Sequence, residues 1–264
     1  MRLARLLMVF ISAPVKPGGV HRLTPAGEFE ARLVEALTIA SHMPKAYEKG
    51  LMLREGRVDA RRTMIGRIIA ESMRESYEAT GLEPIPGLHV SALFLSAAKG
   101  YLEGSLREGF SRAVMTLLYR SGLESAEEFY GALESVGPPE VLAELSSRGV
   151  TRGSIRLNSL SLGDLLEAAS HLDSGFWVNL RFYSRILETA SAVKGSKSLA
   201  EASVKAYAAI VSLMGLNLSL GSIRDMLKVD VNVRRRGFKG ERAMGAAFAA
   251  LALAAEDLGP LSIY

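Results

Sequence analysis

The heptapeptide KPGGVHR near the N-terminus combines residue types that could bind a phosphorylated ligand and move a proton on it. Gly18 and Gly19 let the backbone approach a ligand closely, and consecutive amides in such a turn can form a nest that binds anions. Lys16 and Arg22 could contact phosphate oxygens, Arg through two parallel hydrogen bonds. His21 could carry a proton near neutral pH. The alternative is a solvated Pro-Gly-Gly turn with basic neighbours, which is common in loops.

This segment resembles the N-terminal signature of the ATP:dephospho-coenzyme A triphosphoribosyltransferases, the CitG-like family. That signature is a helix followed by K-P-G-N-V, often with H-R after it. In this chain Gly19 replaces the Asn, and the helix expected from Glu28 onward also fits the family's layout. The residues that match in place are Lys16, Pro17, Gly18, Val20, His21 and Arg22.

The resemblance implies an all-helical enzyme that joins the 2′-hydroxyl of dephospho-coenzyme A to the ribose C1 of ATP. Adenine is expelled and the triphosphate is kept, with Mg²⁺ on the triphosphate held by one or two carboxylates. Asp173, in a pair with Ser174 that resembles the family's acidic D-S pair, is the predicted metal ligand and one of two predicted catalytic residues. The other is His21. The predicted phosphate-binding residues are Lys16, Gly18, Gly19 and Arg22.

Other family signatures are altered in this chain. The central N-T-N-L-G falls near Pro86-Gly87-Leu88-His89, so its Asn and Gly are lost. A P-G-G segment becomes Pro138-Pro139-Glu140, and the late P-G-T-T-A-D falls on residues 239–244, with Met244 where an acid is expected. These departures favour an alternative function, a nucleotide-binding homologue of the family that has lost catalysis.

A third hypothesis rests on the densest basic cluster, Arg234-Arg235-Arg236 with Lys239 and Arg242, which could bind a nucleic-acid backbone. The net charge of +4 is low for a dedicated nucleic-acid-binding protein of 264 residues, so nucleic acid is not the expected partner. The expected partner is a nucleotide or a coenzyme A-like small molecule. Whether the chain forms a homo-oligomer is left open.

Composition narrows the class of protein further. The chain has no Cys, which excludes disulfides, Cys-ligated zinc and thiol nucleophiles. Gln is also absent and Arg outnumbers Lys, which indicates a thermophilic source. The apolar runs Leu6–Ile11 and Met244–Ala255 are too short for a secretory h-region and a membrane span, respectively. The predicted location is the cytoplasm, with no membrane partner.

Helical periodicity dominates the sequence and predicts an all-α bundle of about ten helices in one domain over residues 1–264. Residues 87–100 are apolar nearly all round, as in a central buried helix. The alternation of Val229, Val231 and Val233 predicts an ordered connection, with a short strand as the alternative. The predicted helices cover residues 28–42, 63–77, 87–100, 106–119, 125–136, 138–149, 162–171, 174–193, 198–214 and 238–257.

Overall fold

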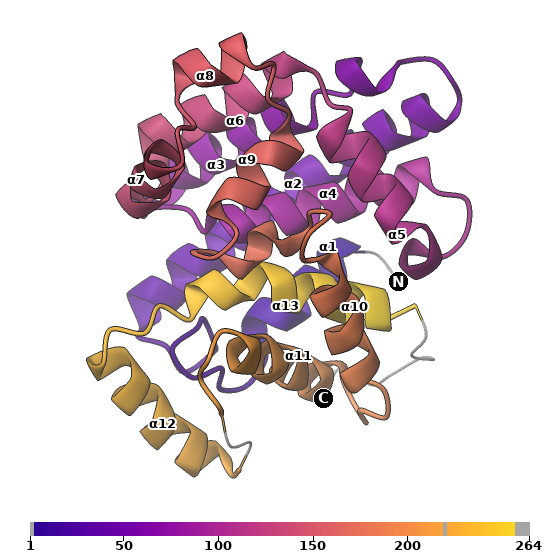
Figure 1. Cartoon of the computed structure of the whole chain (residues 1–264). Helices are drawn as coiled ribbons and strands as arrows, with labels where there is room; N and C mark the ends of the chain where they lie inside the picture. Colours follow the sequence, from indigo (N-terminus) through magenta and orange to yellow (C-terminus); the bar gives the residue numbers. More distant parts are fainter. Residues whose placement is uncertain (1–2, 219–220, 257–264) are drawn as a thin grey trace.

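The computed structural model describes residues 3–218 and 221–256, and these residues form helices joined by loops, with no strand among them (Figure 1). The prediction of an all-α bundle is confirmed. Three short helical segments, residues 60–62, 115–119 and 174–177, add single turns of 3₁₀ or π geometry. The α-helices are α1 (Leu3–Ser12), α2 (Ala26–Arg54), α3 (Ile65–Thr80), α4 (Pro86–Tyr101), α5 (Leu106–Val114), α6 (Leu123–Val136), α7 (Pro139–Ser147), α8 (Arg152–Leu157), α9 (Leu162–Ala169), α10 (Tyr183–Ala192), α11 (Leu199–Leu213), α12 (Ile223–Arg235) and α13 (Glu241–Ala254).

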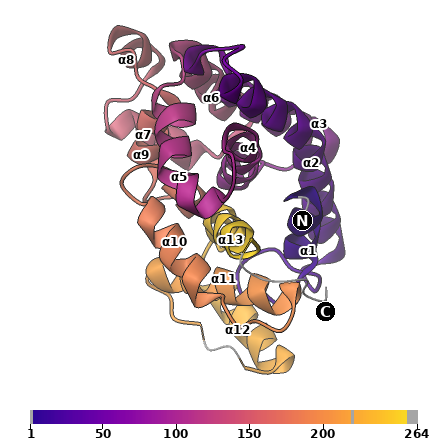
Figure 2. The same cartoon turned by 90° about the vertical axis from the view of Figure 1, so that its right-hand side faces the viewer.

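Helices α4 and α13 lie at the centre of the bundle, and Figure 2 shows both nearly end-on with the other helices around them. Their sequences are apolar on every face, and almost all of their residues are buried. A helix of this kind is stable only when other elements cover it completely. One hydrophobic core takes side chains from every α-helix except α12.

Glycines let the central elements approach to backbone contact. A Cβ built on Gly245 of α13 would lie 2.2 Å from the carbonyl oxygen of Gly87 in α4 and 2.7 Å from the Cα of Gly175. A Cβ on Gly175 would in turn lie 2.3 Å from the Cα of Gly87. Backbone atoms cannot move aside as a flexible side chain can, so only glycine fits at this crossing.

We expect Gly245→Ala to lower the free energy of unfolding by about 3 kcal/mol or more, because the added methyl group forces α4 and α13 apart. Urea denaturation measures the change. The matched control is Gly27→Ala in α2, where an added Cβ has no atom within 4 Å and the change should be small. Equal stability of the two variants would contradict the close-packed crossing.

Helix α2 is longer than the sequence predicts. The predicted helix ends at His42, whereas α2 continues through Pro44 to Arg54. A proline inside a helix removes one hydrogen bond and costs about 3 kcal/mol. The second half of α2 packs closely on α4, where a Cβ on Gly50 would lie 1.9 Å from the carbonyl oxygen of Ala97. This tertiary packing offsets the local cost of the proline.

The predicted connection at Val229, Val231 and Val233 is wrong, because all three valines lie in α12. The buried residues of α12 are Met226, Asp230 and Val233, which are spaced four and three residues apart. That spacing places them on one helical face, so the pattern has the period of a helix and the alternating valines are incidental.

Three further boundaries differ from prediction. The predicted helix over 174–193 is two elements, a 3₁₀ turn over residues 174–177 and then α10. Ser125 does not cap a helix; α6 begins at Leu123, and the Ser125 hydroxyl accepts a hydrogen bond from the Gly66 amide. Helix α8 was not predicted. Ser161 and Asp164 form a reciprocal capping box at the start of α9, which begins where the sequence predicts a helix over 162–171. The predicted helix over 238–257 is α13, and residue 257 lies outside the described residues.

Candidate functional site

The segment from Lys16 to Gly19 is a type II turn. Pro17 occupies the second position, Gly18 occupies the third with φ 77°, and the Gly19 amide donates to the Lys16 carbonyl at 2.8 Å. The third position of this turn requires positive φ, which glycine adopts without strain. The local backbone therefore explains Pro17 and Gly18, whereas Gly19 is required by the close approach of Tyr207, whose hydroxyl oxygen would lie 2.8 Å from a Cβ at that position.

The Gly18 amide faces a carboxylate within the protein. It donates to Oδ1 of Asp230 in α12 at 2.6 Å, and Asp230 also accepts from Nε of Arg234 at 3.0 Å. Of the two amides predicted to bind an anion, that of Gly18 thus binds the Asp230 side chain and that of Gly19 binds the Lys16 carbonyl. The carbonyl oxygens of the turn also accept hydrogen bonds. Pro17 accepts from the Tyr207 hydroxyl at 2.8 Å, Gly18 from the Gly240 amide at 3.0 Å, and Gly19 from the Arg234 guanidinium at 2.6 Å.

Lys16 and His21 are both fully buried beside this turn. The Lys16 Nζ donates to the Phe10 carbonyl at 2.8 Å and lies 5.3 Å from the centre of the Phe10 ring, and burial lowers the pKa of Lys16 to about 7. The Nδ1 of His21 accepts from the Leu23 amide at 3.2 Å, while its Nε2 lies 3.6 Å from Asp230. Arg22 is exposed. The turn therefore links α1 to α11, α12 and the start of α13.

Asp230 holds these parts together, and we expect Asp230→Ala to lower the free energy of unfolding by about 3 kcal/mol. The substitution leaves the Gly18 amide and the Arg234 guanidinium without their shared acceptor. Chemical denaturation gives the value, with Asp225→Ala as the control, because Asp225 lies on the same helix with 64% of its side chain exposed. A loss no larger than that of the control would argue against this role of Asp230.

Burial alone would raise the pKa of Asp230, but hydrogen bonding to His21, the Gly18 amide and Arg234 lowers it to about 2. A carboxylate whose pKa is lower in the folded state stabilises the fold above its unfolded pKa, and that contribution is lost as the pH falls towards 2. The difference in free energy of unfolding between the unmodified protein and Asp230→Ala should therefore decrease as the pH falls from about 4 to about 2.

A cleft with about 570 Å³ of empty space opens where the first turns of α4, α7 and α13 meet α2. None of the three helices has a side chain at its N-cap residue that accepts from the first turn, but each N-terminus has a carboxylate beside it: Asp173 accepts from the Gly87 amide of α4, and Glu140 and Glu241 lie in the first turns of α7 and α13. The residues that line it are Arg32, Glu83, Pro84, Ile85, Pro86, Pro138, Glu140, Val141, Asp173, Lys239, Glu241 and Arg242.

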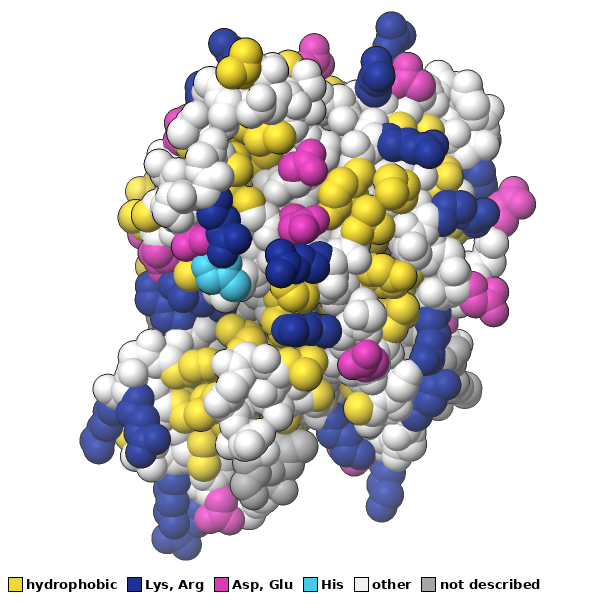
Figure 3. Space-filling model, viewed as in Figure 1, with side chains coloured by type: hydrophobic (Ala, Val, Ile, Leu, Met, Phe, Trp, Pro, Cys, Tyr) yellow, Lys and Arg dark blue, Asp and Glu magenta, His cyan; other side chains and the backbone are white. Residues whose placement is uncertain are grey.

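Charged side chains of both signs surround this cleft. Glu140 of α7 accepts from Nζ of Lys239 at 2.5 Å and from Arg242 at 2.7 Å. The hydrogen bond from Lys239, more than any other contact, lowers the pKa of Glu140 to about 2. Lys239 and Arg242 retain 58% and 29% exposure of their side chains, so both can turn towards a ligand. Figure 3 shows basic and acidic side chains side by side on this face of the molecule.

Asp173 lies at the inner end of the cleft with 3% of its surface exposed. Its carboxylate accepts from the amides of Gly175 at 2.7 Å and Gly87 at 3.1 Å. Burial raises the pKa of Asp173 to about 7, against the opposing effect of these two amides and of Arg242. A carboxyl group of this kind can hold or release a proton near neutral pH.

Of the predicted catalytic, metal-binding and phosphate-binding residues, only Asp173 lines the cleft; Lys16, Gly18, Gly19, His21 and Arg22 do not. Lys239 and Arg242 of the predicted basic cluster also line it. The turn connects to it through the Gly18 carbonyl, which accepts from the Gly240 amide at the start of α13. Three segments that align with altered family signatures do line the cleft, through Pro86, through Pro138 and Glu140, and through Lys239, Glu241 and Arg242.

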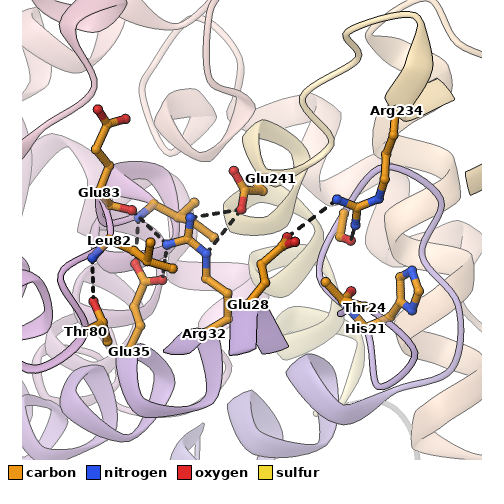
Figure 4. A network of polar contacts seen from close by, with 12 residues as sticks. His21, Thr24, Glu28, Arg32, Glu35, Thr80, Leu82, Glu83, Arg234 and Glu241 are labelled. Atoms are coloured by element: carbon orange, nitrogen blue, oxygen red, sulfur yellow. Dashed lines mark hydrogen bonds and ion pairs between the residues drawn. The ribbon is translucent and has the colours of Figure 1, made fainter. Parts of the chain in front are cut away.

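Sequence reasoning missed Arg32, which lines the cleft from α2. A signal was present, because Glu28, Arg32 and Glu35 are spaced four and three residues apart and so share one helical face. Figure 4 shows all three side chains directed towards groups on other elements. Their partners lie up to about two hundred residues away in the chain, and no local pattern identifies them.

Among residues 3–218 and 221–256, no three His, Asp or Glu side chains lie close enough to hold a metal ion by themselves. Magnesium that arrives with a triphosphate needs only one or two carboxylates, and Asp173, Glu140 and Glu241 are the acidic groups beside Arg242 in the cleft. None of the described helices combines the length and apolarity needed to cross a membrane. No protein-family model, curated protein or solved structure matches this chain.

Proposed function

We propose that the cleft binds a nucleotide and that the protein transfers a (tri)phosphoribosyl group from ATP to a nucleotide-like acceptor, with release of adenine. One observation carries the proposal. Segments that resemble the triphosphoribosyltransferase signatures, although distant in sequence and altered in detail, border the same cleft as Asp173. The cleft also holds three basic side chains, Arg32, Lys239 and Arg242, which suit a phosphate chain.

The proposed roles follow from charge and position. Lys239 and Arg242 exchange their contacts with Glu140 for contacts with the phosphates. Glu140, once released by Lys239 and Arg242, would supply a carboxylate oxygen to magnesium that arrives with the triphosphate. In the reaction, the acceptor hydroxyl oxygen bonds to the ribose C1, the bond from C1 to adenine breaks, and Asp173 exchanges the proton that adenine gains and the hydroxyl loses.

The test is incubation with ATP, Mg²⁺ and dephospho-coenzyme A, with free adenine quantified by chromatography. ATP at one hundred times its Kd should also stabilise the protein by about 2.7 kcal/mol. Arg242→Ala should remove most of that stabilisation, whereas Arg235→Ala, which changes an exposed arginine outside the cleft, should not. Absence of both adenine and thermal stabilisation would refute the proposal.

The second candidate is a nucleotide-binding homologue without catalysis. It is favoured by the internal contacts of the residues that resemble the family signature, since Lys16, Gly18 and His21 are buried against Phe10 and Asp230. This candidate predicts stabilisation by ATP with no adenine released. Product formation above the level of the Arg242→Ala variant would exclude it.

A further inference from the structure

Arg32 reaches the cleft with only 10% of its side chain exposed (Figure 4). Its Nη1 donates to Oε2 of Glu35 and to the Glu83 carbonyl, both at 2.8 Å. Its Nε and Nη2 lie 3.1 Å and 2.9 Å from Oε1 of Glu241. A guanidinium has five N–H groups. These four contacts with the described residues leave one N–H on Nη2 for a ligand.

The two carboxylates that pair with Arg32 differ in how firmly they are held. Glu35 is 2% exposed and is fixed by other groups, whereas Glu241 is 32% exposed at the rim of the cleft. An anion that enters the cleft can therefore replace Glu241 beside Arg32, while Glu35 stays in place. Replacement frees Nε and Nη2 together, which is the paired geometry that binds phosphate oxygens.

Three groups hold the Glu35 carboxylate in place: Arg32, the Ile85 amide and His89. Its Oε1 accepts from the Ile85 amide at 2.6 Å and from Nε2 of His89 at 3.1 Å. Burial alone would raise the pKa of Glu35, but the His89 hydrogen bond, the charge of Arg32 and the Ile85 amide lower it below its usual value. Glu35 is therefore a fixed anion behind Arg32.

His89 completes this arrangement from the interior of α4. It is fully buried, and its Nδ1 lies 3.0 Å from the hydroxyl of Ser72 in α3. A carboxylate only accepts hydrogen bonds, so Nε2 carries the proton that faces Glu35, and in the neutral ring Nδ1 accepts from Ser72. The order Ser72, His89, Glu35 resembles a nucleophilic triad, but each group is buried, so it can act only on Arg32.

We propose that Arg32 is the ligand-binding residue of the cleft for a phosphate chain, and that Glu35 and His89 are positioning residues that orient it. Glu241 is the exchangeable partner that occupies Arg32 until the phosphate binds. The proposal rests on the proposed function, because it assigns the phosphate contact in the same cleft. It extends that function to Arg32 and Glu35, which the sequence signatures do not include, and to His89 at the altered central signature.

The experiment measures binding of inorganic triphosphate and of ATP by isothermal titration calorimetry to the full chain. Arg32→Lys keeps the positive charge but cannot make the paired contacts, and we expect it to weaken binding about 10- to 100-fold. His89→Leu should weaken binding about tenfold, and His89→Gln, whose amide N–H falls near the position of Nε2, should restore most of it. Thermal unfolding of each variant separates lost stability from lost affinity.

A second pair of variants does not touch the buried groups. Glu241→Gln removes the competing carboxylate and should tighten triphosphate binding about three- to tenfold. Glu83→Gln removes the same charge from the same cleft, but only the backbone carbonyl of Glu83 contacts Arg32, so it should have the smaller effect. Equal effects of these two variants, or unchanged affinity in Arg32→Lys, would overturn the proposal while the proposed function stands. Failure of the unmodified protein to bind either probe would instead refute the proposed function.

Discussion

Replacing Lys16 with Met should raise the free energy of unfolding at pH 6 by up to about 4 kcal/mol. Burial lowers the pKa of Lys16 from 10.5 to about 7, so a charged ammonium at pH 6 is costly inside the fold. Methionine fills a similar volume and carries no charge. Loss of the contacts with the Phe10 carbonyl and ring reduces the gain without reversing it.

The pH dependence gives this prediction its sign. Between about pH 7 and pH 10.5 the unfolded chain keeps the proton of Lys16 and the folded chain does not, so the unmodified protein becomes more stable as the pH rises. The advantage of Lys16→Met should therefore be largest below pH 7 and should fade by pH 10.5. Urea denaturation at several pH values measures it, with Lys228→Met, at an exposed position, as the control.

The same variant tests the role of Lys16 predicted from the sequence. If Lys16 binds phosphate, its removal lowers the affinity for ATP. If Lys16 is a structural residue buried beside Phe10, its removal leaves the affinity for ATP unchanged. A variant that is more stable and binds ATP as before would locate the phosphate contacts in the cleft. A variant that is less stable at pH 6 would contradict the predicted cost of the buried charge. A variant that no longer binds ATP would indicate that Lys16 contacts the nucleotide.

The second large effect concerns Asp173. Burial raises its pKa to about 7, so between about pH 4 and pH 7 the folded chain holds a proton that the unfolded chain has lost. Stability contributed by this group is therefore present below pH 4 and is lost as the pH rises to 7, by on the order of 4 kcal/mol. Asp173→Asn cannot titrate, so the stability of the unmodified protein relative to this variant should fall over that interval.

The substitution also has a cost that does not depend on pH, because the asparagine amide would face one of the two backbone N–H groups that Asp173 now accepts from. The titration of Asp173 is therefore measured only by how the difference in unfolding free energy between the unmodified protein and Asp173→Asn changes with pH. Asp225→Asn, at an exposed position of α12, provides the comparison. A difference that stays constant from pH 4 to pH 8 would show that Asp173 is ionised throughout.

The fold could be predicted from sequence because helical periodicity is a local property. The apolar faces of α4 and the capping residues of α9 are visible in a window of a few residues. Predictions failed where tertiary contacts override local signals, as at Pro44, which α2 continues past because it packs on α4. They failed also at α12, whose buried stripe includes a charged residue, Asp230.

The candidate site was harder to predict because its parts come from distant segments. Asp173 was found through a resemblance, Glu140 lies where a family signature is altered, and Arg32 belongs to no motif. The burial of Lys16 and His21 could not be read from their types, since both are usually found at surfaces or in sites. Their partners, Phe10 and Asp230, differ in kind: one is a backbone carbonyl and the other a side chain far along the chain.

Helix α12 lies at the edge of the molecule and contributes nothing to the main hydrophobic core (Figures 1 and 2). Its apolar contacts are a small separate cluster around Met226, and its polar contacts converge on the turn at Gly18 and Gly19. Segments with so little apolar burial open at a lower free energy than global unfolding. Amide hydrogens of α12 should thus exchange with solvent long before those of α4, and the protein should behave as two cooperative units of unequal stability.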